Sequence, residues 1–407
     1  MDSAALRADN APRDLGSRRG TNQSGMRDYN ERLVLSLVRQ HGALAKTDIA
    51  RITGLSAQTI SVIMRELEGE ELLLRGEPIR GKVGQPSVPM SLNPEGAFFL
   101  GLKIGRRSAD LVLIDFCGAI RGMAHSTYAY PEARATLEFA RSGIADLLGR
   151  LDATQRRRVA GLGIAMPFEL WNWADAVGAP RSVMDEWRSI DIRAALSAEL
   201  PFPVYLQNDA TAACGAELVF GQTGDFRNFV YFYVGAFIGG GVVLEGALYA
   251  GPTGNAGALG SMPVPDVSGR PVQLIDIASI AVLEKALISA RRDGGILWTS
   301  PEEWGDLSPH LDAWIDTAAA GLAYAIVASS AVIDFEAAVI DGWMPAGVRS
   351  KLVEAVALKL RQFDIEGLEL PVVREGTVGI HARALGDASV PLSDRFLIGQ
   401  IAMTRGS

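Results

Sequence analysis

The sequence predicts an α/β protein with an N-terminal winged helix-turn-helix and a larger body of two α/β lobes. Residues 42–86 carry helix signals broken by glycine and followed by a glycine-rich hairpin, which is typical of a winged helix. From residue 97 onward, apolar strand patterns alternate with helix patterns, which indicates open-sheet layering. The strands fall into two groups split near residue 215, so we expect two lobes with a cleft between them.

The chain divides into three parts. Residues 1–25 are rich in polar and charged side chains, so we expect a flexible segment. Residues 26–92 make up the predicted winged helix-turn-helix. A turn-rich joint at 93–96 then leads into the body, residues 93–407. A chain of 407 residues is long enough for two or three domains.

The helix that follows Ser56 has one apolar and one polar face. Ser56 is a good N-cap, and Gly54 suits the left-handed turn before it. Ile60, Ile63 and Leu67 recur at helical spacing and are expected to face inward. The outward face then carries Gln58, Thr59, Ser61, Val62 and Arg65. Together with Ser56, this polar set suits contacts with base edges and phosphates in a DNA major groove.

The hairpin after this helix supports the DNA-binding interpretation. Leu72, Leu73 and Leu74 predict a short strand, and a basic, glycine-containing loop follows. We expect Arg80, Lys82 and Gln85 of this loop to approach the phosphate backbone. A small three-helix interaction module is the alternative, because amphipathic helices around a glycine turn are common.

Charge is distributed unevenly along the chain. The net charge is −8, yet residues 1–92 hold 13 Lys and Arg against 11 Asp and Glu. A mildly basic head on an acidic body fits a protein whose head alone meets DNA.

The sequence shows no sign of export or membrane insertion. No apolar run reaches the roughly 20 residues of a membrane span, and the N-terminus has no apolar signal core, so we expect a cytoplasmic protein. Cys117 and Cys214 stand far apart in apolar surroundings, which predicts buried free thiols.

In the body, the spacing of apolar residues and the length of each apolar run indicate which segments are strands and which are helices. The expected strands cover 97–105, 109–118, 159–167, 203–209, 229–236, 239–251, 337–344 and a stretch near Val372. The first two are separated only by a turn, so we expect them to pair as a hairpin. The expected helices cover 134–151, 211–219, 310–332, 346–362 and part of 376–398.

Several of these segments, taken in order, resemble one known family. They are residues 20–23, the winged helix, 92–105, 207–213, 238–257 and 339–343. Together they resemble the ROK family of repressors, open reading frames and kinases, and more narrowly its sugar-responsive repressors. The resemblance covers nearly the whole chain. It implies an actin-like, hexokinase-type body that assembles as a homodimer or homotetramer.

The resemblance also implies a carbohydrate site between the lobes. Asn208 and Asp209 follow an apolar strand and precede a helix, and in the family this pair binds sugar hydroxyls. Capping of the helix by Asn208 is compatible with that role, and we expect both. Further ligand residues are predicted after the strand that ends at 167: Glu169, Trp171, Asn172, Trp173 and, later, Asn255. Tryptophan faces stack on sugar rings, although both tryptophans could instead pack on the lobe beneath.

Departures from the family pattern argue against catalysis and against a metal. Residues 103–107 read Lys-Ile-Gly-Arg-Arg where kinases have Asp-x-Gly-Gly-Thr, so a working ATP site is not expected. Phe237 and Trp343 are expected to crowd a nucleotide. Residues 257–261 lack the family's Glu and His, and 262–279 replace its cysteine-rich zinc segment. We therefore expect no zinc and no cofactor.

These observations predict a regulator and not an enzyme. We expect a homodimer or homotetramer that binds a palindromic double-stranded DNA operator and represses carbohydrate uptake or catabolism genes. A small carbohydrate bound between the lobes would alter the spacing of the two heads. Two alternatives stay open: a sugar kinase with a DNA-binding head, and a regulator controlled by a protein partner.

Overall fold

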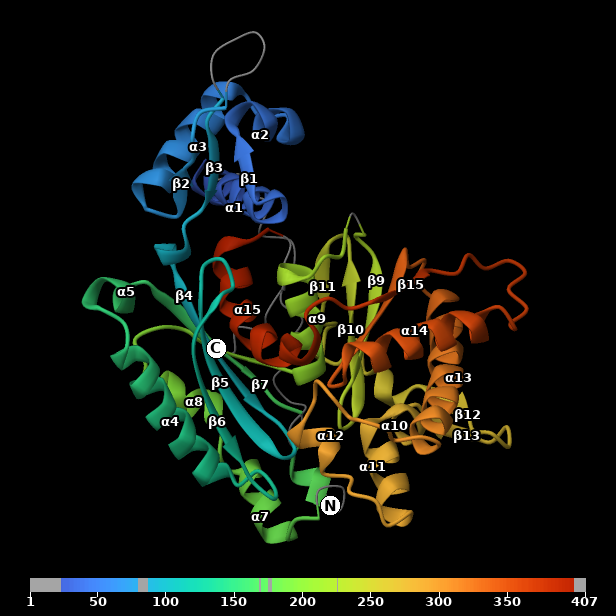
Figure 1. Cartoon of the computed structure of the whole chain (residues 1–407). Helices are drawn as coiled ribbons and strands as arrows, with labels where there is room; N and C mark the ends of the chain where they lie inside the picture. The colour runs from blue at the N-terminus through green and yellow to red at the C-terminus, as the bar shows by residue number, and fades with distance from the viewer. Residues whose placement is uncertain (1–22, 80–86, 168–169, 175–177, 225, 399–407) are drawn as a thin grey trace.

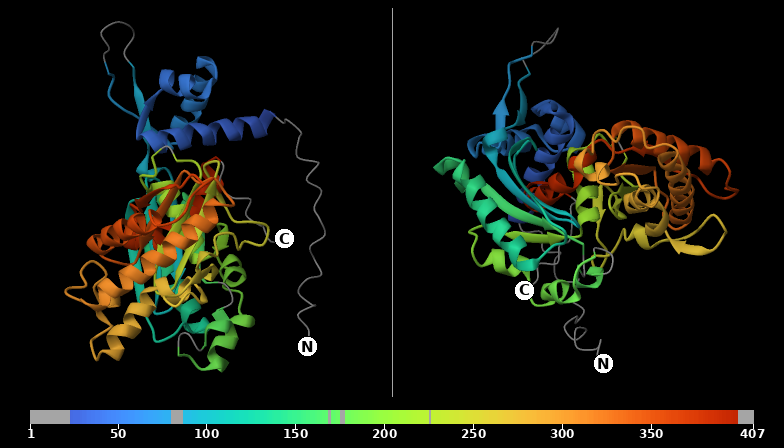
Figure 2. Two further views of the ribbon diagram at one scale, coloured as in Figure 1. Left: turned by 90° about the vertical axis from the view of Figure 1, so that its right-hand side faces the viewer. Right: turned by 60° about the horizontal axis from the view of Figure 1, so that its bottom comes forward.

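The computed structural model describes residues 23–79, 87–167, 170–174, 178–224 and 226–398. A head built from residues 23–79 and 87–92 stands at one end of a larger body (Figures 1 and 2). The body has two lobes, each built on a five-stranded sheet.

The head is a helix-turn-helix with a small antiparallel sheet in the order β1-β3-β2. Its elements are α1 (Gln23–His41), β1 (Ala43–Ala45), α2 (Lys46–Thr53), α3 (Ala57–Gly69), β2 (Leu73–Arg75) and β3 (Pro89–Leu92). Gly54 ends α2 at φ 70°, a conformation that favours glycine. Ser56 caps α3 by accepting a hydrogen bond from the Thr59 amide at 3.1 Å. Ile60, Ile63, Met64 and Leu67 of α3 are buried, as the helical spacing predicts for three of them.

The first lobe carries a mixed sheet in the order β6-β5-β4-β7-β8. Its strands are β4 (Phe98–Ile104), β5 (Ser108–Asp115), β6 (Ile120–Thr127), β7 (Val159–Ala165) and β8 (Val204–Gln207). The expected β4–β5 hairpin is present, and β7 runs parallel to β4. Strand β6 was not expected, because it lies at the sheet edge with largely exposed side chains and lacks an apolar run. The helices of this lobe are α4 (Ala133–Gly149), α5 (Ala153–Arg157), α7 (Arg181–Asp185) and α8 (Ile192–Ser197).

The second lobe carries a sheet in the order β11-β10-β9-β14-β15. Its strands are β9 (Phe229–Val234), β10 (Ile238–Leu244), β11 (Ala247–Tyr249), β14 (Ala337–Gly342) and β15 (Val372–Glu375), with a separate hairpin of β12 (Pro263–Pro265) and β13 (Pro271–Gln273). Its helices are α10 (Ile275–Ala278), α11 (Ile280–Ser289), α12 (Ile296–Thr299), α13 (His310–Ser330) and α14 (Ala346–Leu360).

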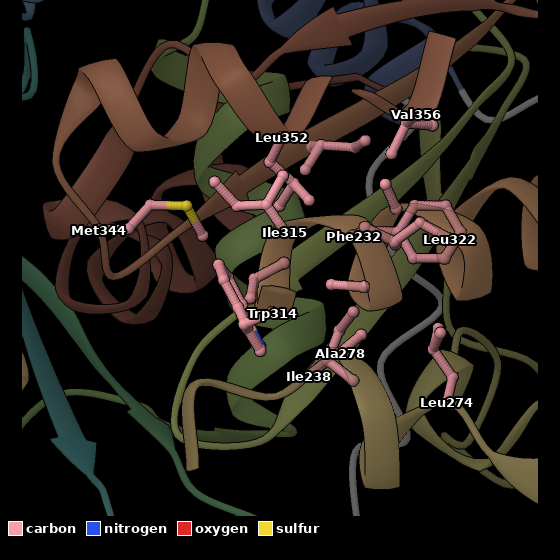
Figure 3. Packing of buried hydrophobic residues seen from close by; sticks show 14 of the residues in the cluster. Phe232, Ile238, Leu274, Ala278, Trp314, Ile315, Leu322, Met344, Leu352 and Val356 are labelled. Carbon is pink, nitrogen blue, oxygen red and sulfur yellow. The ribbon is translucent and has the colours of Figure 1, made fainter. Parts of the chain in front are cut away.

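The core of the second lobe lies between its sheet and its long helices. Phe232 of β9 packs with Ile315 and Leu322 of α13 and with Leu352 of α14 (Figure 3). Within the described residues, α13 is the one helix that has the length and composition of a membrane span. Yet 56% of its most apolar stretch of 18 residues is buried inside the body. It therefore serves as a core helix.

Two helices lie between the sheets: α9 (Asp209–Phe220) and α15 (Ala382–Phe396). Although α15 comes last, it packs on β4 and β7 of the first lobe and along α9. Glycine makes this close packing possible, because a Cβ on Gly386 would stand 2.2 Å from the Ala212 carbonyl oxygen. The pair α9–α15 thus joins the two lobes.

The head is docked on the body and not merely tethered to it. One buried cluster runs from Val34 and Ile60 in the head through Phe99 and Phe116 to Phe396 of α15. Arg158 of the body forms an ion pair with Glu71 of the head and donates to the Glu95 carbonyl at 2.8 Å. The expected joint at 93–96 is therefore held on both sides.

Candidate functional site

A cleft of about 270 Å³ opens between the two lobes, near the lower end of the roughly 300–1,000 Å³ typical of ligand pockets. Residues from both lobes and from α9 and α15 line it. The described side chains that bear on its chemistry are Arg106, Trp173, Asn208, Asp209, Phe237, Asn255, Ser261 and Arg383.

The N-terminus of α9 forms one wall of the cleft. Asn208 caps the helix, and its Oδ1 accepts hydrogen bonds from the amides of Ala210 at 3.1 Å and Thr211 at 3.3 Å. The capping bonds use Oδ1 alone, so the amide nitrogen can still donate to a ligand. Asp209 is 8% exposed, and its Oδ2 lies 3.3 Å from Nη2 of Arg383. The predicted capping role of Asn208 is confirmed, and its position leaves the ligand role available.

An aromatic pair bridges the lobes in the lining of the cleft. The ring of Trp173 meets the ring of Phe237 edge to face, with centroids 5.0 Å apart. Trp171 does not line the cleft, because it lies under the guanidinium of Arg188 at 5.3 Å. Asn172 is exposed and also lies outside the lining, and Glu169 falls outside the described residues. Of the four residues predicted in this segment, the structure brings Trp173 to the cleft.

The strand end that kinases use for phosphate carries an ion pair here. Nζ of Lys103 lies 2.8 Å from Oδ2 of Asp110, and only 12% of the lysine side chain is exposed. Burial alone would raise the pKa of Asp110, but the charge of Lys103 and a bond with His125 hold it below its ordinary value. The ammonium group of Lys103 is therefore already paired with a carboxylate of the same lobe, that of Asp110.

Asp387 of α15 is a fully buried carboxyl group beneath this ion pair. Neither of its carboxyl oxygens has a hydrogen-bond partner among the described residues. Burial raises its pKa well above the ordinary value, and Lys103 only partly opposes the effect. Burial thus favours the neutral form of the Asp387 carboxyl group in the folded protein.

Substitution of Asp387 by asparagine is expected to stabilise the protein at neutral and alkaline pH. The folded pKa is raised, so above about pH 4 the unfolded chain loses this proton while the folded chain keeps it, and stability falls as pH rises. An asparagine does not titrate, so the gain of Asp387→Asn should be larger at pH 8 than at pH 5. Urea unfolding at both pH values measures it, with Asp28→Asn at an exposed site of α1 as the control. An equal gain at both pH values would contradict the assignment.

A hairpin occupies the segment where the family has its zinc loop. Asp266 accepts hydrogen bonds from Ser268 and Arg270 across the β12–β13 turn, and these bonds hold its pKa below the ordinary value. Val264 and Leu274 anchor the hairpin in the core. Within the part of the chain that the structure describes, no three His, Cys, Asp or Glu side chains gather as metal ligands would. Polar turn bonds and apolar packing pin this segment.

The polar face of α3 is open to solvent. Gln58, Val62 and Arg65 are exposed, and Thr59 and Ser61 are half-buried. The hydroxyl of Ser56 is engaged in the helix cap, so it contributes to the start of the helix. Arg80, Lys82 and Gln85 lie outside the described residues, and their phosphate contacts stay predictions.

A half-buried arginine connects the head to α9. Arg39 of α1 donates to the Phe116 carbonyl oxygen, and its guanidinium carbon lies 5.5 Å from the Phe116 ring and 5.8 Å from the Phe220 ring. Phe220 is the last residue of α9, whose other end lines the cleft. A single helix, about 18 Å long at roughly 1.5 Å per residue, therefore spans from the cleft to the head.

The sequence did not predict two arginines that line the cleft, and its prediction of burial was wrong for one of the two cysteines. Arg383 was not predicted, because α15 reaches the cleft only through the fold. Arg106 was noted in the altered kinase segment but was not assigned to the ligand site. Cys214 is buried as expected, but Cys117 is exposed at the β5–β6 turn and the prediction for it was wrong.

Comparison with known proteins yields two family matches. The ROK family pattern matches residues 99–273, and a winged helix-turn-helix DNA-binding pattern matches residues 27–73. An uncharacterized protein, y4fQ, of Sinorhizobium fredii is 24% identical over 92% of this chain and 93% of its own length. The xylose repressor of Bacillus subtilis is 23% identical, over 60% of this chain and 62% of its own length.

Solved structures share the fold. A ROK family transcriptional regulator described as a homologue of the E. coli MLC protein superposes with a TM-score of 0.63 at 19% identity, covering 91% of this chain and 98% of that one. A ROK family glucokinase from Streptomyces griseus, solved with glucose and AMPPNP, gives a TM-score of 0.56 at 18% identity, over 72% and 99%. The predicted actin-like, hexokinase-type body is thus confirmed. The chain therefore carries a winged helix-turn-helix pattern at residues 27–73 ahead of a ROK family pattern at residues 99–273, on a body with the fold of ROK proteins.

Proposed function

We propose that this protein is a DNA-binding transcriptional repressor controlled by a small carbohydrate in the interlobe cleft. The helix α9 carries the proposal, because it lines the cleft at Asn208 and Asp209 and touches Arg39 of the head through Phe220. A ligand that changes the lobe angle moves this helix and, with it, the head. The relatives named xylose repressor and ROK transcriptional regulator support the same function.

The DNA side of the proposal rests on α3 and on two copies of the head. Gln58 and Arg65 supply polar groups and Val62 an apolar one on an exposed face that suits the major groove. A homodimer would place two such helices on the half-sites of a palindromic operator. The proposed cytoplasmic location follows from this role.

Replacing Arg65 by alanine is expected to weaken operator binding about tenfold or more, because one good contact to a base edge discriminates by roughly 1–3 kcal/mol. The operator is first selected from random duplex DNA with the purified protein, and affinity is then measured by fluorescence anisotropy at fixed salt. Arg134→Ala, at a mostly exposed arginine of the body, is the matched control. Equal affinity of the Arg65 variant and the parent would remove α3 as the recognition helix.

The sugar kinase alternative is disfavoured by the segment at 103–107. Lys103 replaces the kinase aspartate and is bound to Asp110, and Phe237 stands in the cleft with its ring 5.5 Å from the Arg106 guanidinium. We therefore propose that the body binds carbohydrate without phosphoryl transfer. Sugar-dependent ATP turnover that is lost in Asp209→Ala would instead establish the kinase.

A further inference from the structure

Two guanidinium groups in the cleft are ion-paired but not fully hydrogen-bonded. Arg106 comes from the β4–β5 turn and Arg383 from the start of α15, and their side chains are only 15% and 14% exposed. Nε of each is buried without a hydrogen-bond partner among the described residues. Their acidic neighbours are loosely placed, with Glu284 3.9 Å from Arg106 and Asp209 3.3 Å from Arg383. Such donors are costly to bury unless something binds them.

Both guanidinium groups lie against the same turn of the second lobe. Arg106 sits over the Phe237 ring at 5.5 Å, and Arg383 over the Tyr233 ring at 4.4 Å. A Cβ on Gly235, between these two aromatic residues, would come within 2.7 Å of Nη2 of Arg383. The β9–β10 turn thus brings together two arginines that are 277 positions apart in the sequence.

The charge of the cleft favours an anion. Among its described lining residues, two arginines face one aspartate, Asp209. The N-terminus of α9 adds the positive end of a helix dipole at the same wall. Burial lowers the pKa of Arg106 because it disfavours the charged guanidinium, and Glu284 opposes this effect only partly. A bound anion would stabilise the charged form.

We infer that the effector is an anionic carbohydrate, either a sugar acid or a sugar phosphate. Its carboxylate or phosphate is bound by Arg106 and Arg383, whose planar donors match both groups. Its hydroxyls are bound by Asn208, Asp209 and Asn255, and its ring lies near Trp173. This inference rests on the proposed function and narrows the class of effector from any small carbohydrate to an acidic one.

Calorimetric titration of the full-length protein tests the inference. The probes are glucose, galactose and xylose, each compared with its aldonate and with its phosphate ester, and inorganic phosphate alone. At least one anionic compound is expected to bind more tightly than its neutral parent sugar and than inorganic phosphate, and to bind more weakly as salt is raised. The carboxylate and phosphate arms identify which group the arginines select.

Arg383→Gln and Arg106→Gln are each expected to weaken that compound about tenfold or more, since a hydrogen bond to a charged group contributes roughly 1.5–3 kcal/mol. Arg107→Gln, at the exposed neighbour outside the cleft lining, should bind like the parent. Neutral sugars that bind as tightly as their acids, or arginine variants that bind the anion unchanged, would overturn the inference.

Operator release by the same compounds separates this inference from the proposed function. Release by a neutral sugar but by no anionic one overturns the anionic effector and leaves the carbohydrate-controlled repressor standing. Failure of every carbohydrate to bind or to release the operator overturns both.

Discussion

Replacing Gly163 by alanine is expected to destabilise the protein by about 3 kcal/mol or more, at or beyond the upper end of typical overpacking costs. A Cβ at this position of β7 would stand 1.8 Å from the Asp387 carbonyl oxygen and 3.2 Å from Cδ of Pro391. The obstacle is helix backbone, which cannot move aside as a flexible side chain would. Helix α15 would have to leave the sheet, and the urea unfolding midpoint should fall steeply.

Gly149→Ala provides the control for this substitution. Gly149 is the last residue of α4, and no neighbouring heavy atom lies within 4 Å of the position of its added Cβ. Alanine is the better helix former, so this variant should be as stable as the parent or slightly more so. If Gly163→Ala unfolds at the same urea concentration as Gly149→Ala, the close packing of α15 on β7 is wrong.

Replacing Arg39 by alanine is expected to cost about 2–4 kcal/mol and to uncouple the head from the body. The substitution leaves a cavity between two phenylalanine rings and removes the donor to the Phe116 carbonyl. Burial lowers the pKa of Arg39 to about 10, so it remains charged at neutral pH and its hydrogen bond is charge-assisted. The head should then unfold at lower urea concentration than the body.

Two measurements check the Arg39 prediction. Urea unfolding followed by proteolysis at the 93–96 joint reports detachment of the head, and operator anisotropy with effector present reports coupling. The variant should bind the operator yet release it weakly when effector is added. Arg32→Ala, at a half-buried arginine of the same helix, is the control. Parent-like stability and release in Arg39→Ala would show that coupling takes another route.

Local chemistry in the sequence was sufficient to predict the head and one wall of the cleft. Gly54 and Ser56 mark a helix end and a helix start that depend on only a few neighbouring residues, and both are confirmed. Asn208 is likewise a cap whose partners lie two and three residues away. These features can be predicted from the sequence because the residues that form the contacts lie close together in it.

The rest of the cleft depends on contacts that are distant in sequence. Arg383 reaches the ligand site only because α15 returns to the first lobe, and no short pattern near residue 383 indicates that path. The sequence gives one local signal that α15 packs on the first sheet: Gly101, Gly161 and Gly163 interrupt the apolar runs of its strands. Glycine in a buried strand often marks close approach of another backbone, and each of these three has α15 against it. Trp171 and Trp173 have different surroundings, although they are two residues apart, because their short 3₁₀ turn directs the two rings to different neighbours.

The return of α15 also sets an order of events during synthesis. Ala388, Leu392 and Phe396 complete the cluster that runs from the head into the first lobe, and the Ile398 amide donates to Ser36 Oγ of α1 at 3.1 Å. At roughly 5–20 residues per second, the ribosome needs about 10–40 s to pass from the end of β8 to the end of α15. During that interval the glycine-lined face of the first sheet is without its cover and exposed to aggregation or chaperones. The head is made first, yet the cluster that docks it on the body is complete only after α15 has been made.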